Sequence, residues 1–434
     1  MSIRQKIKGL ASEGMRKKYR KLRELIIKAE FRFFGLFKIE KEKVVFCNVW
    51  GYGDNPKWVA RAYVKRLEGE IKEEKSASRR EELKKRLDSI YFVTGQLPGE
   101  LRSRSDRRIK FLKNNSFKAN YELATAGIWV DCNRKESYIN KRRGQFYIQT
   151  WHGSLPLKKI EGDCIDVLPE GYAEHAAHDT AMTDAYISNS DFCNEIYRRA
   201  FGFKGKIFCY GSPRMDILLK PDKERAERTK KQIISRINNK KTPGQDFKIC
   251  LYAPTYREET QNFEKRGHGP EKAELSKALE KRFGSKFVFV SRLHPLAMSQ
   301  TGRRSSVYLN LDNEEYLVNG NEFGDIYELM EAADVLITDY SNTLFEFAEA
   351  GKPVFLYAPD SKDYESSRGM YFDYKGLPYP IAASGAELCR KILNYDRDEY
   401  GLRQREFFEA LAVTENGRAS EKIARLIGGI IDKR

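Results

Sequence analysis

A group of polar residues at the start of a predicted helix has the chemistry of an anion site. Residues 334–338 (DVLIT) form an apolar run typical of a buried strand, and residues 344–350 carry apolar side chains at helical spacing. Between them lie Asp339, Ser341, Asn342 and Thr343. Backbone N–H groups at a helix start lack helical partners and the helix dipole is positive there, so a phosphate could bind with help from Ser341 and Thr343. The same residue types are ordinary helix caps that bind nothing, and this alternative stays open.

A histidine follows another predicted strand. Residues 147–150 (YIQT) read as a strand, and Trp151, His152 and Gly153 come directly after it, with Lys158 close behind. Ligands of open α/β sheets bind at the carboxyl ends of strands. A neutral imidazole in that place can take a proton from a hydroxyl near neutral pH. The alternative is a loop histidine held by a hydrogen bond.

Other predicted strands also end in polar turns. The strand at 44–49 leads into a glycine turn in which Asp54 or Asn55 can cap the next helix. The strand at 206–209 leads into YGSPRMD, where Arg214 could clamp a phosphate or form a surface salt bridge with Asp216.

Two more turns of this kind lie in the second half of the chain. The strand at 248–252 delivers Thr255 and Arg257, and the strand at 287–291 delivers His294. Two strand–helix series therefore end their strands in polar turns. If both series are Rossmann-like, these turns face one cleft between two domains.

The elements that must position these turns are strands of apolar residues. The first series holds predicted strands at 44–49, 89–94, 126–130, 147–150, 184–188 and 206–209. The second holds 248–252, 287–291, 307–309, 334–338 and 354–357. Alternating strands and helices predict an α/β fold with parallel sheets.

Composition gives bounds on partners and compartment. The 434 residues carry 79 Lys and Arg against 62 Asp and Glu, a formal net charge of +17. An anionic partner follows: nucleic acid, an anionic membrane face or a polyanionic substrate. The seven cysteines form no CxxC pair, which suits buried thiols in a reducing compartment. We see neither a secretory signal nor an apolar run of about eighteen residues that could span a membrane.

The N-terminal segment is the most basic part of the chain. Residues 1–43 carry apolar residues near helical spacing with many Lys and Arg between them, and they end near the run FRFFGLF. A basic amphipathic helix of this kind suits an anionic membrane surface. The alternative is a helix that packs on the protein's own core.

Several motifs together resemble one known family. In chain order they are WHGSLPLKKI, YGSPRMD, YAPTYR, RLHP, DVLITDYSN, RGMYFDY and ENGRASEKI. They resemble the CDP-glycerol:glycerophosphate glycerophosphotransferase family, which holds teichoic-acid primases and polymerases and related capsule polymerases. The resemblance covers roughly residues 44–427, so the N-terminal helix lies outside it.

The resemblance implies a fold and an activity. The fold is GT-B, two Rossmann-like domains facing a central cleft, in a peripheral protein on the cytoplasmic face of the bacterial membrane. The activity is transfer of glycerol phosphate, or ribitol phosphate, from a CDP-alditol to the hydroxyl of a lipid-linked acceptor, with release of CMP. We expect no metal, no cofactor beyond the CDP-alditol donor, and no nucleic-acid partner.

The family's motif residues carry over to particular positions. Its two histidines match His152, as general base, and His294. Its Asp-Tyr-Ser-Ser turn is 339–342 here with Asn342 in place of the second serine, and Glu346 stands where aspartate is frequent. The predicted substrate-binding residues are Asp54, Asn55, Gly153, Lys158, Arg214, Thr255, Arg257, Asp339, Ser341, Asn342, Thr343 and Glu346.

These inferences divide the chain into five segments. We expect a basic membrane-associating helix over 1–43, an acceptor domain over 44–218, a linker over 219–246, a CDP-alditol-binding domain over 247–384, and C-terminal helices over 385–434. A GT-B glycosyltransferase with a UDP- or GDP-sugar donor would have the same architecture. A non-enzymatic nucleic-acid-binding protein would explain the charge but not the polar turns.

Overall fold

The computed structural model describes residues 13–99, 103–237, 247–255, 272–293, 316–361 and 369–434. The contacts of the chain divide it into two compact units. The first unit comprises Met1–Trp151, Glu174–Tyr186 and Ile423–Arg434, and the second comprises His152–Ala173 and Ile187–Lys422. The predicted five-segment division remains a prediction.

The first sheet has seven strands in the order β3-β2-β1-β4-β5-β6-β7. They are β1 (Glu40–Asn48), β2 (Ile90–Thr94), β3 (Lys110–Lys113), β4 (Ala126–Asp131), β5 (Phe146–Gln149), β6 (Ala185–Ser188) and β7 (Lys206–Cys209). The pairings from β3 through β6 are parallel. The chain order reverses between β1 and β4, as in doubly wound sheets.

The second sheet repeats this pattern with six strands in the order β10-β9-β8-β11-β12-β13, all paired in parallel. They are β8 (Lys248–Tyr252), β9 (Phe287–Ser291), β10 (Leu317–Asn319), β11 (Val335–Thr338), β12 (Val354–Tyr357) and β13 (Ile381–Ala382). The predicted α/β class with parallel sheets is therefore confirmed. Strand β11 is buried along its whole length, which explains why its four residues are all apolar or small.

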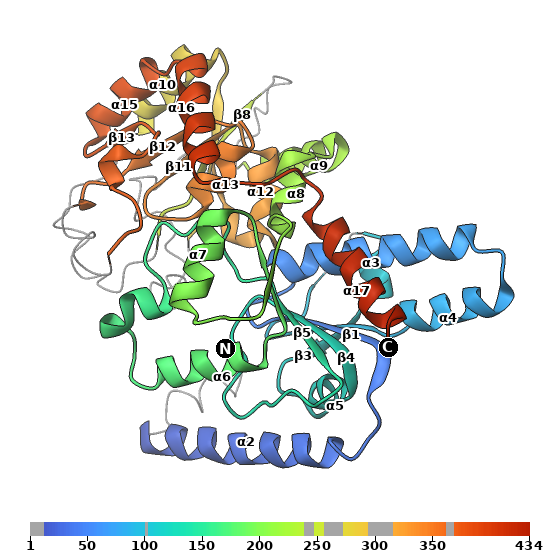
Figure 1. Cartoon of the computed structure of the whole chain (residues 1–434). Coiled ribbons are helices and arrows are strands. Elements are labelled where there is room, and N and C mark those ends of the chain that lie inside the picture. The colour runs from blue at the N-terminus through green and yellow to red at the C-terminus, as the bar shows by residue number, and fades with distance from the viewer. Residues whose placement is uncertain (1–12, 100–102, 238–246, 256–271, 294–315, 362–368) are drawn as a thin grey trace. The chain divides into compact units, whose positions relative to one another are not determined.

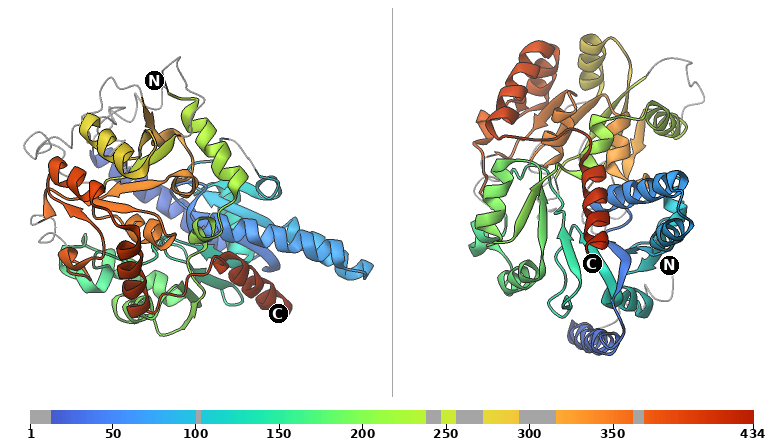
Figure 2. Two further views of the ribbon diagram at one scale, coloured as in Figure 1. Left: turned by 90° about the horizontal axis from the view of Figure 1, so that it is seen from above. Right: turned by 45° about the vertical axis from the view of Figure 1, so that its right-hand side comes forward.

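The helices of the first unit flank its sheet (Figure 1). They are α2 (Glu13–Phe34), α3 (Asp54–Glu73), α4 (Ala77–Leu87), α5 (Phe117–Thr125), α6 (Tyr172–Met182) and most of α17 (Ala419–Asp432), with the short 3-10 helix η1 (Asp106–Arg108). Helices α3 and α4 pack together as a pair that extends beyond the sheet (Figures 1 and 2). Helix α4 starts after Ser76, whose side chain accepts the N–H of Arg79.

The second unit carries the remaining helices. They are α7 (Asp191–Ala200), α8 (Asp216–Leu219), α9 (Lys223–Ile234), α10 (Lys272–Phe283), α12 (Ile326–Ala332), α13 (Thr343–Glu349), α15 (Gly385–Leu393) and α16 (Arg397–Ala410). Short 3-10 helices are η2 (Glu161–Val167), η3 (Pro213–Met215), η6 (Gly320–Glu322) and η7 (Tyr374–Gly376). Helices α10 and α15 pack against each other beside the second sheet (Figure 2).

Most predicted strands occur within a residue or two of their expected bounds. Three strands were not predicted: β3, β10 and β13. The predicted strand at 307–309 lies outside the described residues. The first part of the predicted linker is helix α9, which packs on α12, where Arg225 pairs with Glu331 at 2.7 Å.

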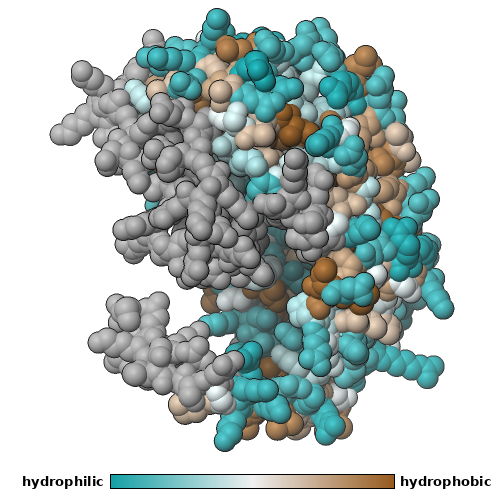
Figure 3. Space-filling model, turned by 90° about the vertical axis from the view of Figure 1, so that its left-hand side faces the viewer, coloured by the Kyte–Doolittle hydropathy of each residue, from teal (hydrophilic) through white to brown (hydrophobic). Residues whose placement is uncertain are grey.

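Polar residues predominate on one face of the molecule (Figure 3). On the face shown in Figure 3, hydrophilic residues cover most of the described area, and hydrophobic ones occur singly or in small groups. Within the described ranges, no helix combines the length and the apolar character that crossing a membrane requires.

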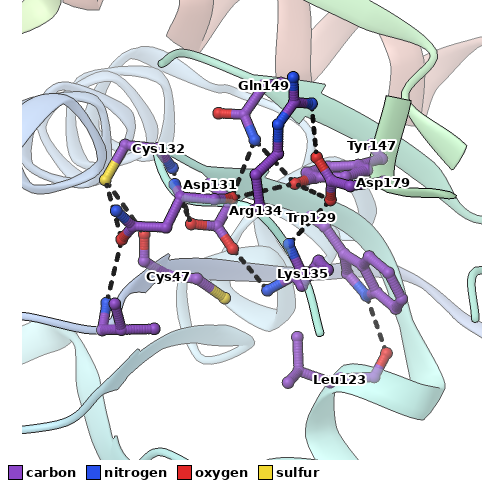
Figure 4. Close-up of polar contacts among 12 residues, drawn as sticks. Cys47, Leu123, Trp129, Asp131, Cys132, Arg134, Lys135, Tyr147, Gln149 and Asp179 are labelled. Atoms are coloured by element: carbon purple, nitrogen blue, oxygen red, sulfur yellow. Dashed lines mark hydrogen bonds and ion pairs between the residues drawn. The ribbon is translucent and has the colours of Figure 1, made fainter. Parts of the chain in front are cut away.

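A network of buried charges lies at the ends of β4 and β5 (Figure 4). Asp131, 2% exposed, pairs with Lys135 at 2.6 Å, and its other oxygen accepts the N–H groups of Cys132 and Asn133. Because these groups are removed from water, the carboxylate and the ammonium each require the other.

A second buried pair lies beside the first. Arg134 donates to Asp179 at 3.0 Å, and the Tyr147 hydroxyl donates to the other oxygen of Asp179, also at 3.0 Å. The same hydroxyl accepts from Gln149 at 2.9 Å. This hydrogen-bonded chain reaches from α6 to the last residue of β5.

Replacing Lys135 with methionine is expected to destabilise the protein by about 3–5 kcal/mol, because Asp131 would remain buried without its partner. Urea unfolding measures this. Lys84→Met is the matched control: its pair with Glu81 is exposed, so it should cost less than about 1 kcal/mol. The double variant Asp131→Asn/Lys135→Met should be more stable than Lys135→Met alone, and a lower stability would contradict the pairing argument.

Candidate active site

The turn after β5 presents His152. Trp151 has a positive φ of 53°. Its N–H donates to the side chain of Gln149 at 2.9 Å, and its carbonyl accepts from the side-chain amide of Asn55 at 2.9 Å. The chain therefore changes direction sharply at Trp151, and the next residue, His152, is exposed while Gly153 is buried.

In the second unit, Arg214 joins this turn to helix α13. The guanidinium lies in η3 and is 5% exposed. It donates to the carbonyl of His152 at 3.0 Å and to Glu346 at 3.0 Å through Nε. Glu346 is fully buried and also accepts from the Tyr327 hydroxyl at 2.5 Å. The surface salt bridge that was the alternative for Arg214 is excluded by this burial.

The segment that follows His152 lies against two other motifs of the second unit. The N–H of Leu157 donates to the side-chain oxygen of Asn342 at 3.1 Å. The N–H of Lys159 donates to the carbonyl of Gly369, and the N–H of Tyr371 donates to the carbonyl of Leu157. Motifs widely separated in sequence thus meet within the second unit. The predicted cleft between two domains remains a prediction. Lys158, half-buried, forms an isolated bridge with Met370.

The turn between β11 and α13 is internally hydrogen-bonded. Asp339 accepts the N–H of Thr255 at 2.8 Å and so ties the end of β8 to the end of β11. Ser341 Oγ accepts from the Thr343 hydroxyl at 2.9 Å. Asn342 takes the N-cap position of α13 but makes no side-chain cap hydrogen bond, because its side-chain oxygen accepts the N–H of Leu157 instead.

An acidic side chain that the sequence did not single out holds the turn that carries Arg214. Glu415 accepts the N–H of Ser212 at 2.7 Å. Its second oxygen would lie 2.6 Å from a Cβ on Gly211, whose φ is +97°, so only glycine fits there. In return, Asp216 of the same turn accepts the N–H groups of Ala419 and Ser420 at the start of α17. The only sequence signal for Glu415 is its place in the ENGRASEKI motif.

The structure corrects the predicted cap of helix α3, and it does not describe two of the predicted site residues. Neither Asp54 nor Asn55 caps α3: the N-cap is Gly53, without a side-chain hydrogen bond, and Asp54 adopts a left-handed φ of 59°. The physical reason is that the Asn55 amide is 1% exposed and is engaged by the carbonyls of the turn after β5. Arg257 and His294 lie outside the described residues.

No group of three or more His, Cys, Asp or Glu is arranged to hold a metal ion in the part of the chain that the structure describes. The site as described is an exposed imidazole on a fixed turn, and the second unit also holds a turn with two hydroxyl groups. Such groups can move a proton and bind a phosphate.

The sequence matches the family described as CDP-Glycerol:Poly(glycerophosphate) glycerophosphotransferase over residues 30–429. This chain belongs to that family. The match confirms the resemblance drawn from the motifs and extends it into α2.

Relatives within the glycerophosphotransferase family include teichoic acid poly(glycerol phosphate) polymerases. One from Bacillus spizizenii is 30% identical over 427 residues, which are 95% of this chain and 98% of the relative. One from Bacillus subtilis is 29% identical over 74% of this chain, but this chain spans only 42% of that protein.

Solved structures confirm the fold class. The wall teichoic acid polymerase TagF superposes with a TM-score of 0.71 at 26% identity, covering 96% of this chain and 98% of the TagF chain. The predicted GT-B type is confirmed at the level of two parallel α/β sheets with this connectivity.

The pH dependence of stability should report on Glu415. Burial raises its pKa from 4.5 to about 8, and burial with repulsion from Glu415 raises the pKa of Glu349 from 4.5 to about 9. A raised carboxyl pKa means that the folded protein holds a proton that the unfolded chain releases above its ordinary pKa. Stability is therefore lost as the pH rises from about 4.5 through 8.

Glu415→Gln should remove part of this loss while still accepting the N–H of Ser212. The variant's stability relative to wild type should rise between pH 5 and pH 9 in urea unfolding. Glu406→Gln, at an exposed position of α16, is the control and should follow the wild-type profile. A Glu415→Gln profile parallel to wild type at all pH values would contradict the assignment.

Proposed function

We propose that this chain is an alditol-phosphate transferase of teichoic acid or capsule synthesis. It moves glycerol phosphate, or ribitol phosphate, from a CDP-alditol to the hydroxyl of a membrane lipid-linked acceptor and releases CMP. The observation that carries the proposal is the family match over residues 30–429, which includes every motif around His152. The names of the relatives, teichoic acid poly(glycerol phosphate) polymerases, support it.

In the proposed reaction, the acceptor oxygen forms a bond to the β-phosphorus of the CDP-alditol. The bond between that phosphorus and the bridging oxygen breaks, and CMP leaves with the bridging oxygen. His152 takes the proton of the acceptor hydroxyl. An exposed imidazole at a strand end has access to such a hydroxyl, and general base catalysis is its ordinary role.

The diphosphate charge would be balanced by polar and basic groups. We assign this role to Ser341, Thr343, Lys158, Arg257 and His294. Phosphoryl transfer depends mainly on positioning and on electrostatic stabilisation, with little covalent chemistry for the protein to do. We therefore propose no cofactor besides the donor substrate.

Three predicted substrate-binding residues have a different place in this proposal. Arg214 and Glu346 are buried and engage each other, and Asn342 is engaged by Leu157. We propose that they set the shape of the site. Arg214 does so by holding the carbonyl of His152.

His152→Ala is expected to lower turnover by roughly 10²–10⁴-fold, because the acceptor would lose its general base. The assay measures CMP release from CDP-glycerol, and separately from CDP-ribitol, with a lipid-linked acceptor. His178→Gln is the control, since His178 binds the carbonyl of Ile139 within the first unit and should keep wild-type turnover. Full turnover by His152→Ala would refute the proposed role.

The same assay separates the alternative donor class. CMP and CDP should compete with the donor, because the proposed site binds a cytidine diphosphate. Strong inhibition by UDP or GDP without inhibition by CMP would favour a sugar-nucleotide enzyme instead.

We propose further that helix α2 binds an anionic membrane surface, which places the protein at the cytoplasmic face of the membrane. One side of α2 packs on the first unit: Ile27 and Phe34 are each 2% exposed, and Phe34 meets the ring of Tyr121 at 5.3 Å. The alternative of a helix packed on the core is thus partly correct.

The other side of α2 remains apolar and exposed. Its large apolar side chains are between 49% and 66% exposed, and they are Met15, Tyr19, Leu22, Leu25, Ile26 and Phe33. Basic residues flank them, so the helix offers an apolar stripe bordered by positive charge. This is the pattern of helices that lie in the interface of anionic bilayers.

The double variant Leu22→Glu/Ile26→Glu should bind vesicles containing anionic lipid about tenfold or more weakly, because two exposed apolar side chains that would insert into the bilayer become charged. Sedimentation with the vesicles measures this. Leu393→Glu/Leu402→Glu makes the same change at exposed positions of α15 and α16 and should bind as wild type does. Equal binding by both double variants would remove the support for α2 as the anchor.

A further inference from the structure

The conformation of Trp151 is unfavourable in itself. Its φ of 53° lies in the left-handed region, where the side chain of a bulky residue crowds the backbone. Glycine adopts this conformation without cost, yet the chain has tryptophan here and glycine two residues later. Strained residues persist only where their surroundings hold them, and they gather at functional sites.

Two buried amides hold both polar groups of the Trp151 backbone. Gln149, 0% exposed, accepts the N–H through Oε1 at 2.9 Å. Asn55, 1% exposed, donates to the Trp151 carbonyl at 2.9 Å and to the Thr150 carbonyl at 3.1 Å. The two amides come from β5 and from the start of α3, so the left-handed residue is held from two elements.

The orientation of the Gln149 amide is itself fixed. Its Nε2 donates to the Tyr147 hydroxyl and to the Asn133 carbonyl, each at 2.9 Å, which leaves Oε1 for Trp151. Figure 4 shows Gln149 beside Tyr147, Arg134 and Asp179 in this buried network. Arg134 also lies over the Trp151 ring at 5.2 Å, so the ring is held as well as the backbone.

We propose that Asn55 and Gln149 are positioning residues for the reaction. By holding Trp151 in the left-handed conformation, they fix the direction in which the next residue, His152, leaves the sheet. The kinetic part of this inference rests on the proposed function, since it takes His152 as the general base. It replaces the prediction that Asn55 binds substrate.

The geometry supports positioning more than simple capping. Asn55 directs one amide group at two successive carbonyls, those immediately before the imidazole-bearing residue. A rotation at Trp151 would break these bonds and the bond to Gln149 together. The direction of the chain at His152 therefore depends on both amides.

The first test is kinetic. Asn55→Ala and Gln149→Leu should each lower kcat by roughly 10²-fold, the cost of a misplaced catalytic group, with a smaller change in the KM for the CDP-alditol. Asn120→Ala is the matched control: Asn120 is an equally buried asparagine of the first unit that donates to Glu30, and its loss should leave kcat unchanged. Thermal unfolding of all variants shows that they are folded.

The double variant Asn55→Ala/His152→Ala separates positioning from a general structural role. If Asn55 acts through His152, removing Asn55 from the His152→Ala protein should cost little further activity. Equal fold-losses in the presence and absence of His152 would overturn the proposal. So would an Asn55→Ala enzyme with the wild-type kcat.

The second test does not depend on catalysis. In NMR spectra of protein labelled at histidine Cε1, one of the five histidine signals disappears in His152→Ala and so identifies that ring. In Asn55→Ala this signal should shift or broaden while the others stay, and in Asn120→Ala all should stay. An unchanged His152 signal would overturn the positioning role. Absence of CMP release by the wild type would count against the proposed function alone.

Discussion

The burial of Arg214 opposite Glu346 is the constraint on which the candidate site depends. A guanidinium and a carboxylate removed from water each cost several kcal/mol unless their hydrogen bonds are met. Here Arg214 donates to Glu346 and to the His152 carbonyl, and Glu346 also accepts from the Tyr327 hydroxyl. Such a pair adds little net stability, but any arrangement that separates its members is excluded. The pair therefore fixes where η3, α12 and α13 lie around the turn that bears the histidine.

A second set of buried charges lies within the first unit and determines the backbone at Trp151. Two ion pairs are buried there, Asp131 with Lys135 and Arg134 with Asp179. A buried pair is stable only when all of its hydrogen-bonding groups have partners. Satisfying Asp179 orients the Tyr147 hydroxyl, and that hydroxyl orients the Gln149 amide. A backbone conformation that would be unstable alone is thereby held at Trp151. Buried polar groups must be paired, and this one rule determines two features of the turn. It determines the backbone conformation of Trp151 and the position of the His152 carbonyl.

The fold was largely predictable because strand burial leaves a plain signal. Central strands such as β4 and β11 are buried on both faces and read as apolar runs. Edge strands leave no such signal: β3 is Lys-Phe-Leu-Lys with exposed ends, and β13 has two residues. The turns were predictable as polar, because they follow the carboxyl ends of parallel strands. The cleft between two domains that they were expected to line remains a prediction.

The partners within the site were not predictable from residue type. The sequence offered Arg214 as a phosphate clamp or as a surface salt bridge with Asp216. In the structure it pairs with Glu346, a buried carboxylate 132 residues away. Gln149 is a single amide in an ordinary strand sequence, and Glu415 a single acid in a loop, so neither forms a pattern. Their roles follow from unsatisfied backbone groups that exist only once the chain has folded.

The asparagine at position 342 shows how a departure from the family's pattern can be read physically. In the Asp-Tyr-Ser-Ser pattern the second serine reads as a phosphate donor, and the amide could have taken the same role. In the structure its oxygen accepts the N–H of Leu157 at 3.1 Å and so fastens the segment after His152 to the start of α13. A serine hydroxyl is one atom shorter and would accept this bond only if the two segments lay closer. The amide oxygen of Asn342 is therefore part of the site's frame. The phosphate contacts that we propose for this turn are the hydroxyl groups of Ser341 and Thr343, which are hydrogen-bonded to each other.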